Sequence, residues 1–422
     1  MKPLLVCVVF FSTLGALEAA ADISAKAYDA AAALQTTGKE SKAIKAAQAL
    51  VEARTQALGA EDRETLRARL LLAESLMLLD QETEAQTQLR ALLPVLTKIC
   101  GAEDRETLRC RAGIIATLIT LDKNAEAEKE CRRLIPLQTK VLGAEDLATL
   151  ETRGRLARAL TEQGKLAEAE KEYRALLPAY ARVYGAESEG ALVKRYYFAI
   201  VLYKEGKKAE AEKEIREVMT TTERVLGAGN ETALDAGITL AEWLQAEGRD
   251  AEAEPLMRKV LSRLAKASGR EHQDTLEFEL ELILAVSAQG RYAEAEKNLR
   301  RLIATETRAL GPEHPYTLTA RGNFGALLSR QGKTAEAEKE YREMLPLCER
   351  VHGPKDLKTL RACHGLAVAL SKQGKYAEAL PYAQRALAGY RKVLGKGNAD
   401  LQSAQDMVDE LVKLTAKAKA KA

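Results

Sequence analysis

One glycine recurs every 42 residues along most of the chain. The nine positions are Gly59, Gly101, Gly143, Gly185, Gly227, Gly269, Gly311, Gly353 and Gly395. Because no insertion or deletion interrupts the series, every unit must occupy the same structural slot as its neighbour. Such spacing is typical of a solenoid, a stack of one supersecondary unit. Solenoids mostly bind other macromolecules, so the period favours a binding protein without naming its partner.

A helix is predicted to start three residues after each glycine. Most side chains in this column are good helix N-caps: Asp62, Asp104, Asp146, Ser188, Asn230, His272, His314, Asp356 and Asn398. The helix is expected to run for about seventeen residues and to end where a left-handed residue closes it. That second column holds Asp80, Asp122, Gly164, Gly206, Gly248, Gly290, Gly332 and Gly374, with Gly38 one period earlier.

A second helix is predicted to follow, marked by an alanine that never changes within the chain. The column is Ala43, Ala85, Ala127, Ala169, Ala211, Ala253, Ala295, Ala337 and Ala379. Nine alanines in one register predict two helices that cross too closely for a larger side chain. A further buried column is predicted farther along, at Leu89, Tyr173, Ile215, Met257, Leu299 and Tyr341.

The unit resembles the tetratricopeptide repeat, in the long form found in kinesin light chains. The residues that carry this resemblance are Leu310–Leu318, Asn323, Leu327 and Gln331–Glu338. Length alone would also fit a HEAT-like repeat, but the alanine five residues after the glycine turn favours the tetratricopeptide. The resemblance covers residues 22–412 and implies an all-α fold, an α-solenoid that winds as a right-handed superhelix.

The chain is predicted to have four parts. Residues 1–21 join Lys2, an apolar run and Ala19-Ala20-Ala21, the layout of a signal peptide. Residues 22–58 form an N-terminal helix pair, 59–394 eight repeats, and 395–422 a capping helix with a basic tail. We therefore expect export to the periplasm after cleavage near Ala21. An uncleaved N-terminus that anchors the protein to membrane is the alternative.

Composition and motifs exclude several classes of function. The 64 basic and 61 acidic residues are interspersed, which argues against a nucleic-acid binder. The lysine-rich tail is interpreted as a solvated end or as a weak contact with anionic lipid; its lysines are Lys413, Lys417, Lys419 and Lys421. We find no phosphate-binding loop, nucleophile motif or metal motif, so no catalytic residue, metal or cofactor is predicted. Cys348 and Cys363 flank one turn, and a disulfide between them stays an open alternative.

Partner contacts are predicted on first-helix positions that do not enter the core and that vary between units. These are Arg155, Arg158, Tyr196, Tyr197, Tyr203, Glu242, Asn323 and His364. Arginine beside tyrosine is typical of interaction hot spots. The resemblance implies a groove for acidic, aromatic-containing peptides. Among the equivalent positions, however, only Asn323 keeps the asparagine of the kinesin light chain type, so the same peptide specificity does not follow.

The sequence therefore predicts a non-catalytic scaffold that binds a protein or peptide in a concave groove. An alternative comes from the resemblance: bacterial kinesin light chains share this repeat, which implies binding to bacterial tubulin filaments and their linkage to membrane. An enzyme with its site in the cavity of the helical array is a second, disfavoured alternative.

Overall fold

The computed structural model describes residues 28–30, 32–33, 35, 40–395 and 397–419. These residues form helices joined by short connections, and no strand occurs among them, so the predicted all-α fold is confirmed. The predicted signal or anchor segment at 1–21, Gly38 and Lys421 lie outside the described residues. No described helix has the length and apolar character needed to cross a membrane.

The chain divides into two compact units, residues 1–225 and 226–422, a division that the uninterrupted period did not predict. The helices of unit 1 are α2 (Glu40–Leu58), α3 (Arg63–Met77), α4 (Glu82–Ile99), α5 (Arg105–Thr120), α6 (Asn124–Val141), α7 (Leu147–Glu162), α8 (Leu166–Tyr184), α9 (Glu189–Lys204) and α10 (Lys208–Leu226). Those of unit 2 are α11 (Glu231–Ala246), α12 (Asp250–Ala267), α13 (Gln273–Ala288), α14 (Tyr292–Ala309), α15 (Pro315–Arg330), α16 (Thr334–Val351), α17 (Leu357–Lys372), α18 (Tyr376–Val393) and α19 (Ala399–Lys419).

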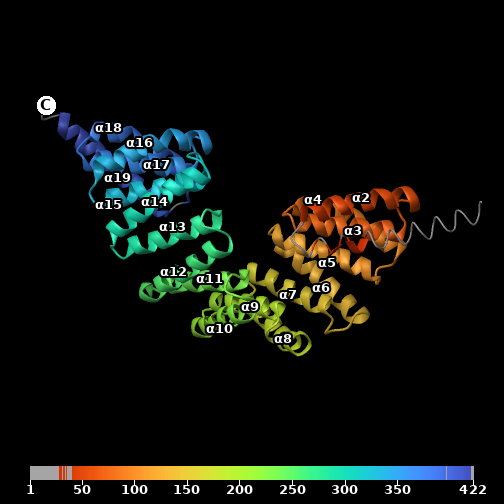
Figure 1. Ribbon diagram of the computed structural model, residues 1–422. Coiled ribbons are helices and arrows are strands. Elements are labelled where there is room, and N and C mark those ends of the chain that lie inside the picture. The colour runs from red at the N-terminus through yellow and green to blue at the C-terminus, as the bar shows by residue number, and fades with distance from the viewer. Residues whose placement is uncertain (1–27, 31, 34, 36–39, 396, 420–422) are drawn as a thin grey trace, which may run out of the picture. The chain divides into compact units, whose positions relative to one another are not determined.

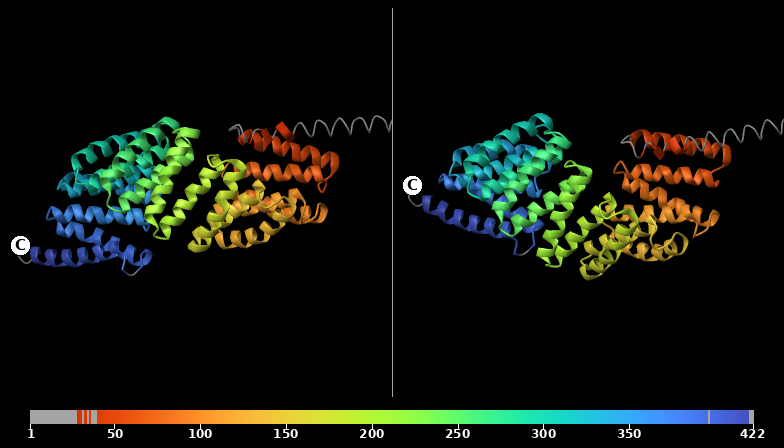
Figure 2. Two further views of the ribbon diagram at one scale, coloured as in Figure 1. Left: turned by 90° about the horizontal axis from the view of Figure 1, so that it is seen from below. Right: turned by 60° about the horizontal axis from the view of Figure 1, so that its bottom comes forward.

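Consecutive helices in each unit pack side by side as hairpins (Figure 1). The first helix of a hairpin also packs against the first helix of the next one. In unit 1 this series is α3, α5, α7 and α9, and in unit 2 α15 packs between α13 and α17 (Figure 2). The helices α3, α5, α7 and α9 in unit 1, and α13, α15 and α17 in unit 2, therefore share one side of their unit, and that side carries most of the positions predicted to meet a partner.

The caps explain where the first helices start. Asp146 is extended at its backbone and its carboxylate accepts the amide of Ala148 at 2.9 Å. His314 occupies the same position, and its Nδ1 accepts the amide of Tyr316 at 3.3 Å. The helices that follow run for 15 or 16 residues, slightly fewer than predicted.

The predicted turn residues adopt positive φ at the ends of the first helices. Asp80 and Asp122 have φ of 54° and 56°, in the column where later units hold glycine. The last marker glycine is an exception, because Gly397 and not Gly395 takes the positive φ, at 88°. Only the φ pattern of this turn changes, because Asn398 still stands in the cap column and accepts the amide of Asp400 at 2.9 Å.

The alanine column lies at the centre of each hairpin. Its nine members are at most 1% exposed. The second predicted column, from Leu89 to Tyr341, is also buried. A larger side chain at the alanine positions would have to push two helices apart, which explains why only alanine stands there.

Candidate functional site

The first helices α11, α13, α15 and α17 of unit 2 each carry four aligned positions that stay half-buried or exposed. They are spaced by four, three and four residues, which places them on one helix face. We call this face the inner stripe. In unit 2 it consists of Asp235, Thr239, Glu242 and Ala246 on α11; Glu277, Glu281, Leu284 and Ala288 on α13; Thr319, Asn323, Ala326 and Arg330 on α15; and Arg361, Gly365, Val368 and Lys372 on α17.

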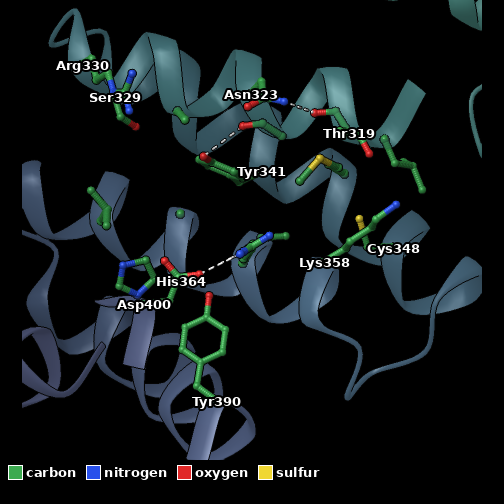
Figure 3. A pocket seen from close by; sticks show the side chains of 18 of the residues that line it. Thr319, Asn323, Ser329, Arg330, Tyr341, Cys348, Lys358, His364, Tyr390 and Asp400 are labelled. Carbon is green, nitrogen blue, oxygen red and sulfur yellow. Dashed lines mark hydrogen bonds and ion pairs between the residues drawn. The ribbon is translucent and has the colours of Figure 1, made fainter. Parts of the chain in front are cut away.

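A cavity of about 560 Å³ opens along the inner stripe of α15 and α17, and all eight stripe residues of these helices line it. Tyr341 and Met344 of α16 and Tyr390 of α18 line it as well (Figure 3). A second cavity of about 260 Å³ shares Asn323, Ala326 and Arg330 with the first. It extends to Leu284 of α13. The two cavities adjoin, and we call them together the unit 2 groove.

Two glycines allow the Tyr341 ring to line this cavity. The Tyr341 ring lies against Gly365 of α17, where a β-carbon on the glycine would come within 2.3 Å of the ring carbon Cζ. A β-carbon at Gly325 of α15 would come within 2.7 Å of the same ring carbon. Tyr341 can therefore lie between the two helices only because both positions are glycine. Its hydroxyl donates to the Gly322 carbonyl at 3.4 Å.

Cations surround the groove. Among the described residues, the side chains of Arg330 and Lys358 form no ion pair or hydrogen bond. Lys372 Nζ donates to the Ser329 carbonyl at 2.8 Å, and Arg361 pairs with Asp400 at 3.0 Å. The Ser329 hydroxyl is buried without a hydrogen-bond partner in the described chain. The groove thus combines an apolar floor with unused donors that suit an anionic group.

Two family models, both described as tetratricopeptide repeat, match the chain. One matches residues 149–189, 196–231 and 234–274, and the other matches 274–349 and 323–392. The chain belongs to the tetratricopeptide repeat family. Repeat solenoids of this family are typically non-catalytic scaffolds for protein–protein interaction. No curated protein matches the chain.

Solved structures support the same fold. The apo form of RapI has a TM-score of 0.57 at 11% identity, covering 83% of this chain and 98% of that chain. The apo quorum sensor NprR from B. thuringiensis has a TM-score of 0.56 at 12% identity, covering 87% and 99%. BtubC (BKLC) from P. vanneervenii has a TM-score of 0.42 at 16% identity, covering 64% and 92%. The likeness to the first two concerns the fold alone, the TM-score of the third carries no argument, and the bacterial tubulin partner stays a prediction.

In this tetratricopeptide repeat protein, two of the predicted contact residues lie in the unit 2 groove. Asn323 and His364 line the larger cavity from α15 and α17 (Figure 3). Asn323 Nδ2 donates to the Thr319 carbonyl at 3.0 Å. Burial lowers the pKa of His364, although Asp400 opposes the shift.

Two of the predicted residues of unit 1, Arg158 and Tyr196, lie against Tyr197 of α9. The Arg158 guanidinium lies 5.0 Å from the centre of the Tyr197 ring, and Tyr196 meets that ring edge-on at 5.2 Å. Arg155 is not part of this group, because it donates to the Ala112 carbonyl of α5 at 3.3 Å. Tyr203 lies beside Lys208, with 5.5 Å between Nζ and the ring centre.

Sequence reasoning missed most of the groove. Arg330, Lys358 and Tyr341 were not predicted as contact residues. The repeat register contained a signal for Arg330, because it follows Asn323 by seven positions on the same helix face. The cavity itself had no such signal, since it depends on where the Tyr341 ring lies. Glu242, which was predicted, lies on the inner stripe of α11.

No group of three or more His, Cys, Asp or Glu side chains in the described part of the chain could hold a metal ion. Cys348 and Cys363 are free thiols, so the disulfide left open by the sequence is not formed in this structure. Burial raises the pKa of the Cys363 thiol to about 11, which leaves it unreactive at neutral pH.

Proposed function

We propose that this protein is a non-catalytic binding module whose unit 2 groove holds an extended segment of a protein partner. The observation that carries the proposal is the larger cavity, where an apolar floor lies next to cations without partners. An apolar side chain of the partner would enter between Tyr341 and Met344. Acidic groups beside it would meet Arg330 and Lys358.

The physical basis of binding follows from the lining. Burying an apolar side chain in a preformed cavity supplies the free energy, while charged groups fix the register of the segment. Tyr341 is held by its packing against Gly325 and Gly365, so little side-chain entropy is lost when a ligand arrives. Arg330 and Lys358 lie on the exposed rim, where they would act mainly on association rate and specificity.

The proposal is tested by filling the cavity. Ala326 lines both parts of the groove, so Ala326→Trp should occupy the space of the partner's apolar side chain. The probes are two fluorescein-labelled peptides with one central tyrosine and glutamates on one side of it only, before it in one peptide and after it in the other, titrated at low salt and followed by anisotropy. We expect saturable binding of at least one peptide to the wild-type chain and a loss of about tenfold or more in its affinity for the variant.

Ala309→Trp is the matched control, because Ala309 is exposed on α14 and lines neither cavity. It should bind as the wild type does, and both variants should keep the wild-type circular dichroism. Absence of saturable binding to the wild type, or equal binding by Ala326→Trp, would contradict the proposal.

Unit 1 supplies a second proposed contact surface at Arg158, Tyr196 and Tyr197. Arginine and tyrosine give large contact area at low entropic cost, and here the arginine already lies over a ring. Arg158→Glu in the same titration should weaken binding only if the partner reaches this cluster.

A further inference from the structure

The charges on the first helices of unit 2 are sorted by sign. All charged residues of helices α11 and α13 are acidic. They are Glu231, Asp235, Glu242, Asp274, Glu277, Glu279 and Glu281. All charged residues of helices α15 and α17 are basic. They are Arg321, Arg330, Lys358, Arg361 and Lys372. Members of both groups lie on the inner stripe. The face of unit 2 therefore changes from negative to positive between α13 and α15.

In unit 1 each of the first helices α3, α5, α7 and α9 carries both signs, and some of these opposite charges form ion pairs between neighbouring helices. On α7 and α9, Glu162 pairs with Lys204 at 3.5 Å and Glu151 pairs with Lys194 at 2.9 Å. On α3 and α5, Glu74 and Arg109 pair at 2.5 Å. Neighbouring first helices thus neutralise one another. In unit 2 the first helices cannot form such ion pairs within either half. The acidic half consists of α11 and α13, and the basic half consists of α15 and α17.

The acidic half of the unit 2 stripe consists of carboxylates without cationic partners. Among the described residues, Asp235, Glu242 and Glu281 form no ion pair, and Glu242 and Glu281 are exposed. Burial and the neighbouring Glu242 and Glu277 raise the pKa of Glu281. Burial and Glu231 raise the pKa of Asp235 to about 6. A cationic ligand would relieve this repulsion.

The groove lies in the basic half and reaches the acidic half only at α13, so a segment that leaves the smaller cavity would continue along the inner stripe past Glu281. The smaller cavity begins at Leu284, one turn from Glu281 on α13, and the larger cavity ends at Arg361 and Lys372 on α17. Packed helices lie about 8–10 Å apart, so four of them span roughly 30 Å. An extended chain covers that distance with about nine or ten residues.

We propose that the unit 2 groove binds a partner segment whose charge changes sign along its length. Lysine or arginine residues lie against Asp235, Glu242 and Glu281; an apolar residue enters the cavity beside Tyr341; and aspartate or glutamate residues lie against Arg330 and Lys358. The inference rests on the proposed function and adds the basic half of the ligand. A uniformly acidic segment would be repelled by α11 and α13, which gives the site its specificity.

The test compares four labelled peptides of equal length with the same central tyrosine. Two are bipolar and differ only in which half, lysine-rich or glutamate-rich, comes first; the others are wholly acidic and wholly basic. We expect one bipolar peptide to bind the full chain about tenfold more tightly than the acidic peptide. The double variant Glu242→Lys/Glu281→Lys should reverse this order, weakening the bipolar peptide and strengthening the acidic one.

Glu52→Lys/Glu84→Lys is the control, since it makes the same change in net charge on α2 and α4 of unit 1. It should preserve the order of the four affinities. Equal binding of the acidic and bipolar peptides, unaffected by reversing Glu242 and Glu281, would overturn this inference and leave the proposed function intact. Failure of every peptide would overturn both. A wild-type dimer that the double variant dissociates would also overturn it, because the stripe would then pair with a second copy.

Discussion

One buried position shows how much the chemistry of a residue can vary inside a constant fold. It lies near the end of each second helix and holds Arg54, Leu96, Gln138, Tyr180, Thr222, Leu264, Glu306, Cys348 and Tyr390, all of them buried. Among these residues, Glu306 has the highest free-energy cost of burial, because neither carboxylate oxygen has a hydrogen-bond partner among the described residues. Burial, aided by Glu279, raises the pKa of Glu306 to about 7.

Glu306 should make the protein less stable as the pH rises. The unfolded chain ionises this group near pH 4.3 and the folded chain near pH 7, so the free energy of unfolding falls across that interval. We expect Glu306→Leu, the residue of two equivalent positions, to raise stability at pH 8 by on the order of 3 kcal/mol. Urea unfolding followed by circular dichroism at pH 4 and pH 8 measures the free energy of unfolding of the variant and of the wild type.

The stability gained by Glu306→Leu should become smaller towards pH 4, where the wild-type carboxyl is protonated in both the folded and the unfolded state. Glu306→Gln should also remove the pH dependence but give less stability, since a buried polar group remains without a partner. An equal gain at both pH values would show that packing, and not ionisation, is responsible.

At the scale of elements, a ladder of ion pairs joins the second helices. Glu296 of α14 binds Arg300 one turn later at 2.9 Å and Lys333 of the next hairpin at 2.6 Å. Arg300 also reaches Glu336 of α16 at 2.9 Å. The pattern recurs at Glu338, which binds Arg342 and Lys375. Each of these sets of ion pairs links a hairpin to its neighbour. The repeated glutamates and arginines therefore have a role beyond helix propensity.

Glu296→Gln should destabilise the protein at neutral pH and have little effect in acid. The pKa of Glu296 is lowered to about 2, mainly by its hydrogen bond with Lys333. A carboxylate with a depressed pKa contributes stability above about pH 4.3 and loses it as the pH falls towards 2. Exposed pairs contribute ~0.2–1 kcal/mol each, so we expect a loss of about 1 kcal/mol at pH 7.

Urea unfolding at pH 7 and pH 3 measures this difference. Glu52→Gln is the control, because Glu52 is exposed on α2 and forms no ion pair within the described residues. It should change stability little at either pH. A deficit of Glu296→Gln that stays constant between pH 7 and pH 3 would contradict the role given to the ion pairs.

At the scale of the molecule, the division into two compact units affects how instability spreads. In repeat proteins each hairpin contacts only its neighbours, so stability is approximately a sum of local terms. A perturbation inside one unit should therefore weaken that unit first. The period alone suggests one uniform array, whereas the packing indicates two bodies that each hold their own core.

Overpacking one alanine in each unit tests this. Ala127→Leu in unit 1 and Ala337→Leu in unit 2 should each cost ~1–3 kcal/mol, because both positions are fully buried. Hydrogen exchange followed by mass spectrometry should show faster exchange mainly in α5–α8 for the first variant and in α15–α18 for the second. Equal acceleration in both units would mean that the chain unfolds as a single cooperative body.

The sequence determined the helices, their caps and their hairpin partners. Each of these depends on local chemistry that the period repeats: an Asp, Asn, Ser or His cap, a residue with positive φ, and an alanine at the crossing. It also placed Asn323 and His364 on the face that lines the cavity. These features are local, so one repeat predicts the next.

Only the tertiary structure decided where the groove opens and which charges remain without partners. Both depend on contacts between repeats. Gly325 and Gly365 belong to different hairpins, and the space that they leave is taken by the Tyr341 ring, which lines the cavity from there. Likewise, Glu162 and Glu281 look alike in sequence, but a lysine lies beside only the first. A partner is therefore expected where the contacts between repeats leave charge and space unfilled.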